Sequence, residues 1–84
     1  MFYVYILYSQ KIDKYYIGQT EDVAKRLISH SKRISPYTSI SDDWKLVYTE
    51  SFDTSAEAIH RENEIKKKKS RKYIEWVISE SRLL

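Results

Sequence analysis

Hydrophobic and polar positions divide the chain into short strands and amphipathic helices. Residues 2–9 (FYVYILYS) are rich in β-branched and aromatic side chains and predict a first strand, and residues 15–20 (YYIGQT) predict a second. The link over residues 10–13 is polar and short, which predicts a turn and antiparallel pairing of the two strands. Residues 44–52 (WKLVYTESF) alternate between apolar and polar side chains and predict a third strand.

Capping residues mark three helices between and after these strands. Asp22 can cap a helix that runs to about residue 33, and residues 34–43 are expected to form a loop that contains the only proline. Thr54 and Glu57 have the spacing of a capping box, which predicts a helix that ends at about residue 69. Ser70 can cap a last helix.

The resulting order, ββαβαα, predicts a small three-stranded antiparallel sheet flanked by helices, an α/β or α+β layer fold. With 84 residues and no linker rich in Pro, Gly or Ser, the chain is expected to form one domain over residues 1–84. Alternation along the first strand places Tyr3 and Tyr5 on one face. The other face carries Phe2, Val4 and Ile6. The helix positions expected to pack inward are Val23, Leu27 and Ile28, then Ala58, Ile59 and Ile65, and finally Tyr73, Trp76 and Val77.

Composition excludes several classes of protein. The chain has no cysteine, which excludes a disulfide framework, a thiolate zinc site and a thiol nucleophile. Its longest apolar-rich run, residues 2–8, is far shorter than the ~20 residues that span a bilayer. The same run lacks the basic start and the small-residue cleavage site of a signal peptide. We therefore expect a cytoplasmic protein without a membrane partner.

Positive charge is concentrated in one segment. The net charge is +3, but residues 61–72 alone contain seven Lys or Arg against two Glu. Such a local excess is typical of a surface that binds phosphates. Lysines at the end of a solvated helix, where they interact favourably with the helix dipole, would give the same pattern. The candidate nucleic-acid-binding residues are Lys66, Lys67, Lys68, Lys69, Arg71 and Lys72.

Two placements on the first half of the chain indicate a binding site. Gly18 is the only glycine and stands two positions after Tyr16 in a predicted strand, where glycine often marks a close approach by a ligand or by another part of the chain. Arg26 and His30 are four residues apart and share one face of the predicted helix. An arginine there could bind a phosphate through two hydrogen bonds, and the histidine could hold a proton. A surface arginine beside a neutral partner is the alternative.

Glu62 falls within the inward stripe of its predicted helix, three residues after Ile59 and three before Ile65. A carboxylate in that position needs a cation, because a bare buried charge is too costly. One carboxylate, with water and substrate phosphate as further ligands, is a usual way to hold Mg²⁺. The alternative is a salt bridge to a neighbouring Arg or Lys, such as Arg26.

In this order the residues resemble the GIY-YIG nuclease superfamily, most of all its short members related to the N-terminal domain of the excinuclease of DNA repair and to intron-encoded endonucleases. The resemblance spans residue 2 to about residue 78. Its motifs are Tyr3-Val4-Tyr5 at the GIY position, Tyr16-Ile17-Gly18 as the YIG itself, Arg26-x-x-x-His30, and Glu62 at the position of the metal-binding glutamate.

The resemblance implies hydrolysis of DNA phosphodiester bonds with one Mg²⁺ or Mn²⁺ ion and no small-molecule cofactor. It implies that Tyr5 and Tyr16 flank the attacking water, with Tyr16 as the general base. Arg26 would stabilise the phosphorane, His30 would orient or accept a proton, and Glu62 would hold the metal. A free tyrosine has a pKa near 10, so we expect Arg26 and the metal to lower the pKa of the base.

Two departures from the family pattern and two other interpretations remain. Tyr3 replaces the glycine of GIY, and Asn63 is too close to the metal-binding glutamate to replace an asparagine that many relatives carry further on. Without a separate DNA-binding domain, binding should be weak, salt-sensitive and tolerant of single-stranded or structured DNA.

A catalytically silent nucleic-acid-binding module is one alternative. A protein-interaction domain is the other, for instance a homodimer through exposed Tyr37, Tyr48 or Trp76; the oligomeric state stays open.

Overall fold

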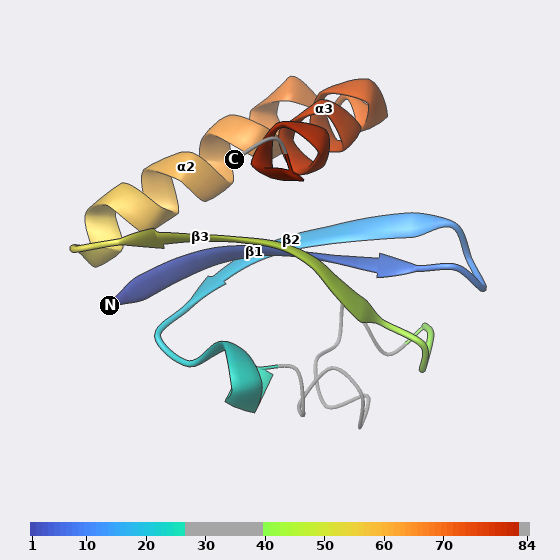
Figure 1. The fold of residues 1–84 in the computed structure, drawn as a ribbon, viewed down its shortest axis with the longest axis horizontal. Coiled ribbons are helices and arrows are strands. Elements are labelled where there is room, and N and C mark those ends of the chain that lie inside the picture. The colour runs from blue at the N-terminus through green and yellow to red at the C-terminus, as the bar shows by residue number, and fades with distance from the viewer. Residues whose placement is uncertain (27–39, 83–84) are drawn as a thin grey trace.

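The computed structural model describes residues 1–26 and 40–82. Three antiparallel strands, β1 (Phe2–Ser9), β2 (Lys14–Thr20) and β3 (Lys45–Phe52), form one sheet in the order β2-β1-β3. Two helices, α2 (Ser55–Lys68) and α3 (Arg71–Arg82), lie together on one face of the sheet, and helical residues 23–26 lie on the opposite side (Figure 1). The predicted fold class is confirmed, and the predicted bounds of β1, β2, β3 and α2 agree to within one residue.

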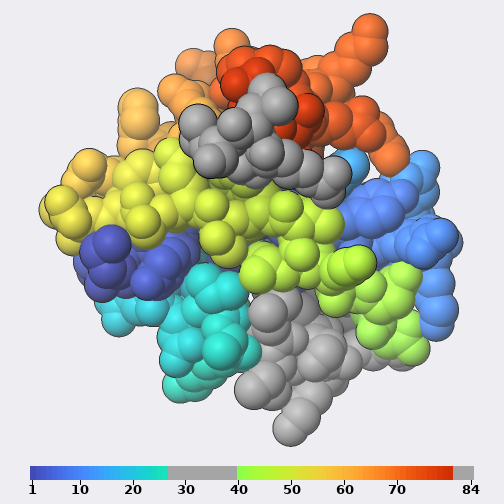
Figure 2. Space-filling model, in the orientation of Figure 1, coloured from blue at the N-terminus to red at the C-terminus, as the bar shows by residue number. Residues whose placement is uncertain are grey.

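Strand β1 is the centre of the fold because it pairs with both neighbours. Its apolar face packs under α2 and α3, and the predicted separation of Val4 and Ile6 from Tyr5 is confirmed by the register, in which Tyr5 lies opposite Gly18. The buried cluster between the sheet and the helices consists of Val4, Ile6, Ile17, Ala58, Ile65, Val77 and Ile78. In the space-filling view, β3 forms the middle of one face, between the two long helices and the helical residues 23–26 (Figure 2).

The predicted helix caps are confirmed. The Asp22 carboxylate accepts the N–H of Lys25 at 3.0 Å and begins the first helix, whose predicted continuation beyond residue 26 lies outside the described residues. Thr54 accepts the N–H of Glu57 at 3.2 Å, and Ser70 accepts the N–H of Tyr73 at 3.2 Å. Each cap satisfies a backbone donor that the helix start leaves unpaired.

Two residues expected to face inward are exposed. Ile59 is 43% exposed and Trp76 is 55% exposed. On α2 the buried residues are Ala58 and Ile65, and Ile59 lies about 100° round the helix from Ala58. On α3 the buried pair is Val77 and Ile78, which turns the neighbouring Trp76 towards solvent. The prediction for these two positions is therefore wrong, because the sheet covers a narrower stripe of each helix than the apolar positions in the sequence indicate.

An interface built from exposed aromatic residues needs Tyr48, Tyr37 or Trp76 at the surface. Tyr48 is half-buried against the core cluster, and its hydroxyl donates to Glu50 Oε2 at 2.5 Å. Tyr37 lies outside the described residues. Of these three aromatic residues, Trp76 is the one the structure exposes, with its ring 5.8 Å from that of Tyr73.

Polar contacts fix the β1–β2 turn to two later segments. Arg71 at the start of α3 donates to Asp13 Oδ1 at 2.5 Å and to the Asp13 carbonyl at 3.1 Å, with its guanidinium 5.3 Å from the centre of the Tyr15 ring. On the other side, Asp43 Oδ1 accepts the buried Ser9 hydroxyl at 2.5 Å. This second contact holds the residues that lead into β3 against the end of β1, with Trp44 next to Tyr16 on β2.

No helix in residues 1–26 and 40–82 is long and apolar enough to cross a membrane.

Candidate functional site

Gly18, the only glycine of the sequence, lies on β2 where the side chain of Tyr5 from the neighbouring strand β1 crosses over it. A Cβ atom on Gly18 would lie 2.5 Å from the Tyr5 hydroxyl oxygen and 2.7 Å from Tyr5 Cζ. Both distances are too short for a carbon contact, so the phenol of Tyr5 occupies the space that any other residue would fill. The close approach expected at this glycine is therefore made by Tyr5 itself.

Tyr16 lies beside Tyr5 on the same face of the sheet. The two ring centres are 6.2 Å apart, and on its other side Tyr16 meets Trp44 edge-on at 6.4 Å. Tyr5 is fully buried, whereas Tyr16 is half-buried and borders a groove of about 510 Å³. The residues that line this groove are Lys14, Tyr15, Tyr16, Ile17, Ile40, Trp44 and Lys66.

Side chains from three other segments influence the hydroxyl of Tyr5. Burial and the neighbouring Tyr16 raise the pKa of Tyr5 to about 12, the charge and hydrogen bond of Arg26 lower it, and the charge of Glu62 raises it. Arg26 thus acts in the expected direction. At Tyr5, burial outweighs the arginine. The expected lowering concerned the general base with a metal bound, and it stays a prediction. Tyr16, Arg26 and Glu62 therefore each lie within electrostatic reach of the Tyr5 hydroxyl.

Glu62 comes from α2, four residues after the buried Ala58 and three before the buried Ile65. Its side chain is 17% exposed, and its Oε2 accepts a hydrogen bond from Lys66 Nζ at 3.2 Å. The predicted half-buried position is confirmed, although Ile59 is not part of the stripe. The cation in contact is Lys66, one turn further along the same helix, and not the Arg26 named as an example.

The donor set around Glu62 fits an ion with few protein ligands. No group of three or more His, Cys, Asp or Glu side chains that could hold a metal occurs in residues 1–26 and 40–82. A single carboxylate is compatible with Mg²⁺ or Mn²⁺, because Mg²⁺ keeps several waters and takes further oxygen ligands from a substrate phosphate. Glu62 is the residue that would hold such an ion here.

Arg26 follows directly from the cap that begins the first helix, and its N–H donates to the Asp22 carbonyl at 3.1 Å. Its side chain is exposed on a second groove of about 360 Å³. That groove is lined by Phe2, Gln19, Thr20, Glu21, Asp22, Lys25, Arg26 and Ser55. His30, expected one turn later, lies outside the described residues, so its predicted role stays a prediction.

The comparisons with known proteins show the family of the chain. Residues 1–74 match the model of the GIY-YIG catalytic domain. The chain belongs to the GIY-YIG family. It is similar to a UPF0213 protein of Staphylococcus saprophyticus, with 43% identity over 65 residues, which are 76% of this chain and 78% of that protein. A UPF0213 protein of Staphylococcus epidermidis is 42% identical over 52 residues, which are 61% of this chain and 63% of that protein.

A solved structure shows the same fold. The solution NMR structure of the UPF0213 protein BH0048 from Bacillus halodurans matches with a TM-score of 0.59 and 36% identity. The match covers 94% of this chain and 84% of that chain. The names of these relatives state no activity. The family assignment therefore supports a nuclease fold and does not by itself identify the reaction.

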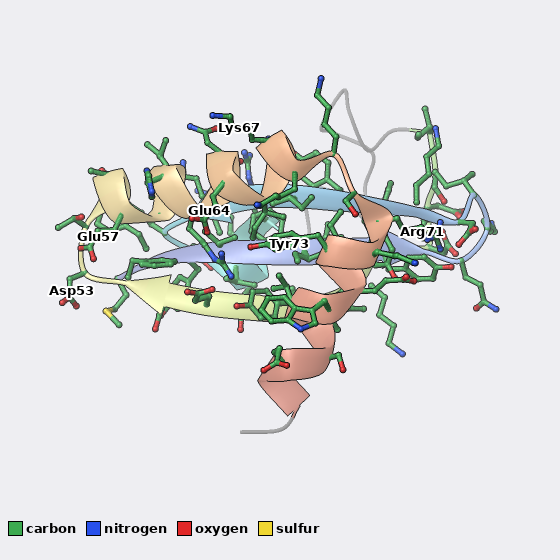
Figure 3. All side chains as sticks on the ribbon, turned by 90° about the horizontal axis from the view of Figure 1, so that it is seen from above. Asp53, Glu57, Glu64, Lys67, Arg71 and Tyr73 are labelled. Carbon is green, nitrogen blue, oxygen red and sulfur yellow. The ribbon has the colours of Figure 1, made fainter. Side chains whose placement is uncertain are left out.

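The six candidate nucleic-acid-binding residues of this GIY-YIG chain are all exposed, and three of them have a partner in the described residues. Arg71 is held by Asp13, Lys66 by Glu62, and the Lys68 ammonium lies 5.5 Å from the centre of the Tyr73 ring. The other three are exposed and form no ion pair with another residue in the described ranges: Lys67, Lys69 and Lys72. Lys67 points away from α3, whereas Glu64 and Tyr73 lie between the two helices (Figure 3). The binding role of all six stays a prediction.

The alternative of a salt bridge from Glu62 to a neighbouring Arg or Lys is borne out, with Lys66 as the partner. This partner has a sequence signal, because side chains four apart on a helix are neighbours. The contact of Trp44 with Tyr16 has none, because it depends on how the start of β3 is held against the end of β1.

Proposed function

We propose that this GIY-YIG protein is a metal-dependent endonuclease that hydrolyses DNA phosphodiester bonds. The observation that supports the proposal is that the rings of Tyr5 and Tyr16 lie 6.2 Å apart on one face of the sheet. Arg26 and Glu62, from two further segments, both influence the pKa of Tyr5. A guanidinium, a carboxylate and two phenols are the groups required to bind a phosphate, hold a cation and move a proton.

The two tyrosines have different environments and therefore different proposed roles. The pKa of Tyr5 is raised to about 12, so its hydroxyl keeps its proton at neutral pH and is a poor proton acceptor. Tyr16 borders the open groove, where a water molecule and a phosphate can reach its hydroxyl. Tyr16 is thus the better general base, as the family resemblance implies.

In the proposed reaction, the oxygen of the attacking water bonds to phosphorus while the bond from phosphorus to the leaving oxygen breaks. The deprotonated Tyr16 hydroxyl takes a proton from the attacking water, and the leaving oxygen takes a proton from solvent. Arg26 donates to the non-bridging oxygens, whose charge grows in the transition state. One such preorganised donor contributes about 3–4 kcal/mol in other enzymes.

A Mg²⁺ or Mn²⁺ ion bound at Glu62 would polarise a phosphate oxygen and neutralise developing charge. Glu62 suits that role because its side chain is mostly buried yet its charge reaches Tyr5. The family resemblance implies that His30, which lies outside the described residues, would orient or accept a proton.

Binding of DNA would rest on the exposed lysines near the end of α2 and the start of α3. Lys67, Lys69 and Lys72 have no competing ion pair in the described part of the chain, so they can neutralise phosphates. So few contacts give weak binding that falls with salt and does not depend strongly on sequence. This favours DNA that is single-stranded or structured, without a long recognition site.

The test is cleavage of supercoiled plasmid and of single-stranded oligonucleotides with Mg²⁺ or Mn²⁺. Glu62→Gln should abolish product while DNA affinity, measured by fluorescence anisotropy, persists. Glu64→Gln is the matched control, because that carboxylate stands on the same helix but binds Arg61. Equal product from Glu62→Gln and the parent would refute the proposal. Salt-sensitive binding by the parent without any product would support the silent binding module instead.

A further inference from the structure

Glu62 already has a cationic partner from its own helix. Lys66 Nζ lies 3.2 Å from Glu62 Oε2, and the Lys66 side chain is 49% exposed against 17% for that of Glu62. A mostly buried carboxylate is costly without a nearby positive charge. The ammonium of Lys66 therefore stabilises the same carboxylate to which the proposed function assigns a divalent ion.

Lys66 also belongs to the groove beside the proposed general base. It lines the groove of about 510 Å³ together with Tyr16, Trp44 and Lys14. The side chain of lysine is a flexible four-carbon stem with a compact charge at its end. The ammonium that contacts Glu62 can thus reach the groove by rotation of its own side chain, without movement of α2.

We propose that Lys66 is the resident counter-cation of Glu62 and exchanges with the divalent ion. The ammonium occupies the carboxylate when no ion is bound. With an ion held by Glu62, the Lys66 side chain would turn into the groove, where its ammonium would contact a phosphate of the DNA strand beside Tyr16. This inference rests on the proposed function, and it adds that ion binding and DNA binding reinforce each other through one lysine.

Two physical arguments support the exchange. Like charges a few ångströms apart repel even in water, so the ammonium and a divalent ion cannot share Oε2 at ion-pair distance. Coupling between two ligands is reciprocal, so an ion that releases Lys66 for DNA must itself be bound more tightly when DNA holds Lys66. Lys67 does not take this part, because it is not among the residues that line the groove beside Tyr16.

The first experiment measures Mn²⁺ affinity by calorimetry on the full chain without DNA. Lys66→Met should bind Mn²⁺ about two- to fivefold more tightly than the parent, because a competing cation is gone. Lys67→Met is the matched control and should bind like the parent, while Glu62→Gln should lose the site. Equal affinities for Lys66→Met and Lys67→Met would overturn the exchange yet leave the metal site of the proposed function intact. Parent-like binding by Glu62→Gln would overturn both.

The second experiment measures affinity for a fluorescein-labelled oligonucleotide with and without Mn²⁺. The Tyr16→Phe background keeps the strand intact, because the proposed proton acceptor is absent. Mn²⁺ should tighten binding in this background, and added Lys66→Met should remove most of that gain. Added Lys67→Met should weaken binding equally with and without Mn²⁺. The same Mn²⁺-dependent gain in both lysine variants would mean that the ion bridges to DNA without Lys66, which contradicts the proposal.

Discussion

The two faces of β1 are both buried, but they hold different kinds of side chain. Towards α2 and α3, Val4 and Ile6 join a purely apolar cluster. On the opposite face, Tyr5 and Ser9 are buried with polar atoms that hydrogen-bond or interact with charged groups from other segments. The comparison teaches that a single strand can place core-packing residues on one face and candidate catalytic residues on the other, because successive residues point to opposite faces.

The largest effect on stability should come from the apolar face. Ile65→Ala removes a fully buried side chain from the cluster and should lower the free energy of unfolding by about 2–5 kcal/mol. Ile59→Ala on the exposed side of the same helix should change it by less than about 0.5 kcal/mol. Urea denaturation of both variants checks this. Similar losses for the two would mean that the apolar face does not carry the stability.

Gly18→Ala should damage the polar face. The added Cβ must displace the Tyr5 phenol, at a cost of about 1–3 kcal/mol in stability. Cleavage should fall by about 100-fold, because a shift of about 1 Å in a catalytic group has that effect.

A double-mutant cycle separates the Gly18 clash from a backbone effect. In a Tyr5→Leu background the space over Gly18 is open, so added Gly18→Ala should cost little stability. A full additive loss in the double variant would show that the phenol is not the reason for the glycine.

The tyrosines of the two faces should respond alike to alkaline pH. Burial is the largest cause that raises the pKa of Tyr5, and of Tyr48 on the apolar face, from 10.0 to about 12. Because the folded pKa is the higher one, their contribution to stability is complete below pH 10 and is lost as pH rises to about 12. Urea midpoints between these limits should fall less steeply in Tyr5→Phe and in Tyr48→Phe than in the parent. An unchanged slope in both variants would contradict the raised values.

The smallest effect should come from the end of α2, which belongs to neither face. Lys69 ends this helix in the left-handed conformation, with φ 48° and ψ 35°. Lys69→Gly should raise the free energy of unfolding by about 0.5–1 kcal/mol, because glycine adopts this conformation without a steric cost. Lys67→Gly, inside the helix, should lower it by about 1 kcal/mol. Thermal unfolding of the two variants checks the opposite signs, and a loss in both would refute the argument.

The sequence motifs name the candidate residues Tyr5, Tyr16, Arg26 and Glu62, and their catalytic roles stay a prediction. Their geometry was not predictable, although Tyr16, Arg26 and Glu62 all influence the pKa of Tyr5. The raised pKa of Tyr5 could not be predicted from the motif, because burial is a property of the packed sheet and not of neighbours in the chain.

The sequence by itself determined the strands, their order and the helix caps. Asp22, Thr54 and Ser70 each bond to a backbone group three residues away, so their effect needs no tertiary contact. The tertiary structure alone decided that Ile59 and Trp76 face outward, that the Tyr5 phenol crosses Gly18, and that Trp44 meets Tyr16. These features depend on how strands pair and how helices lie across the sheet, and such contacts join residues that are distant in the chain.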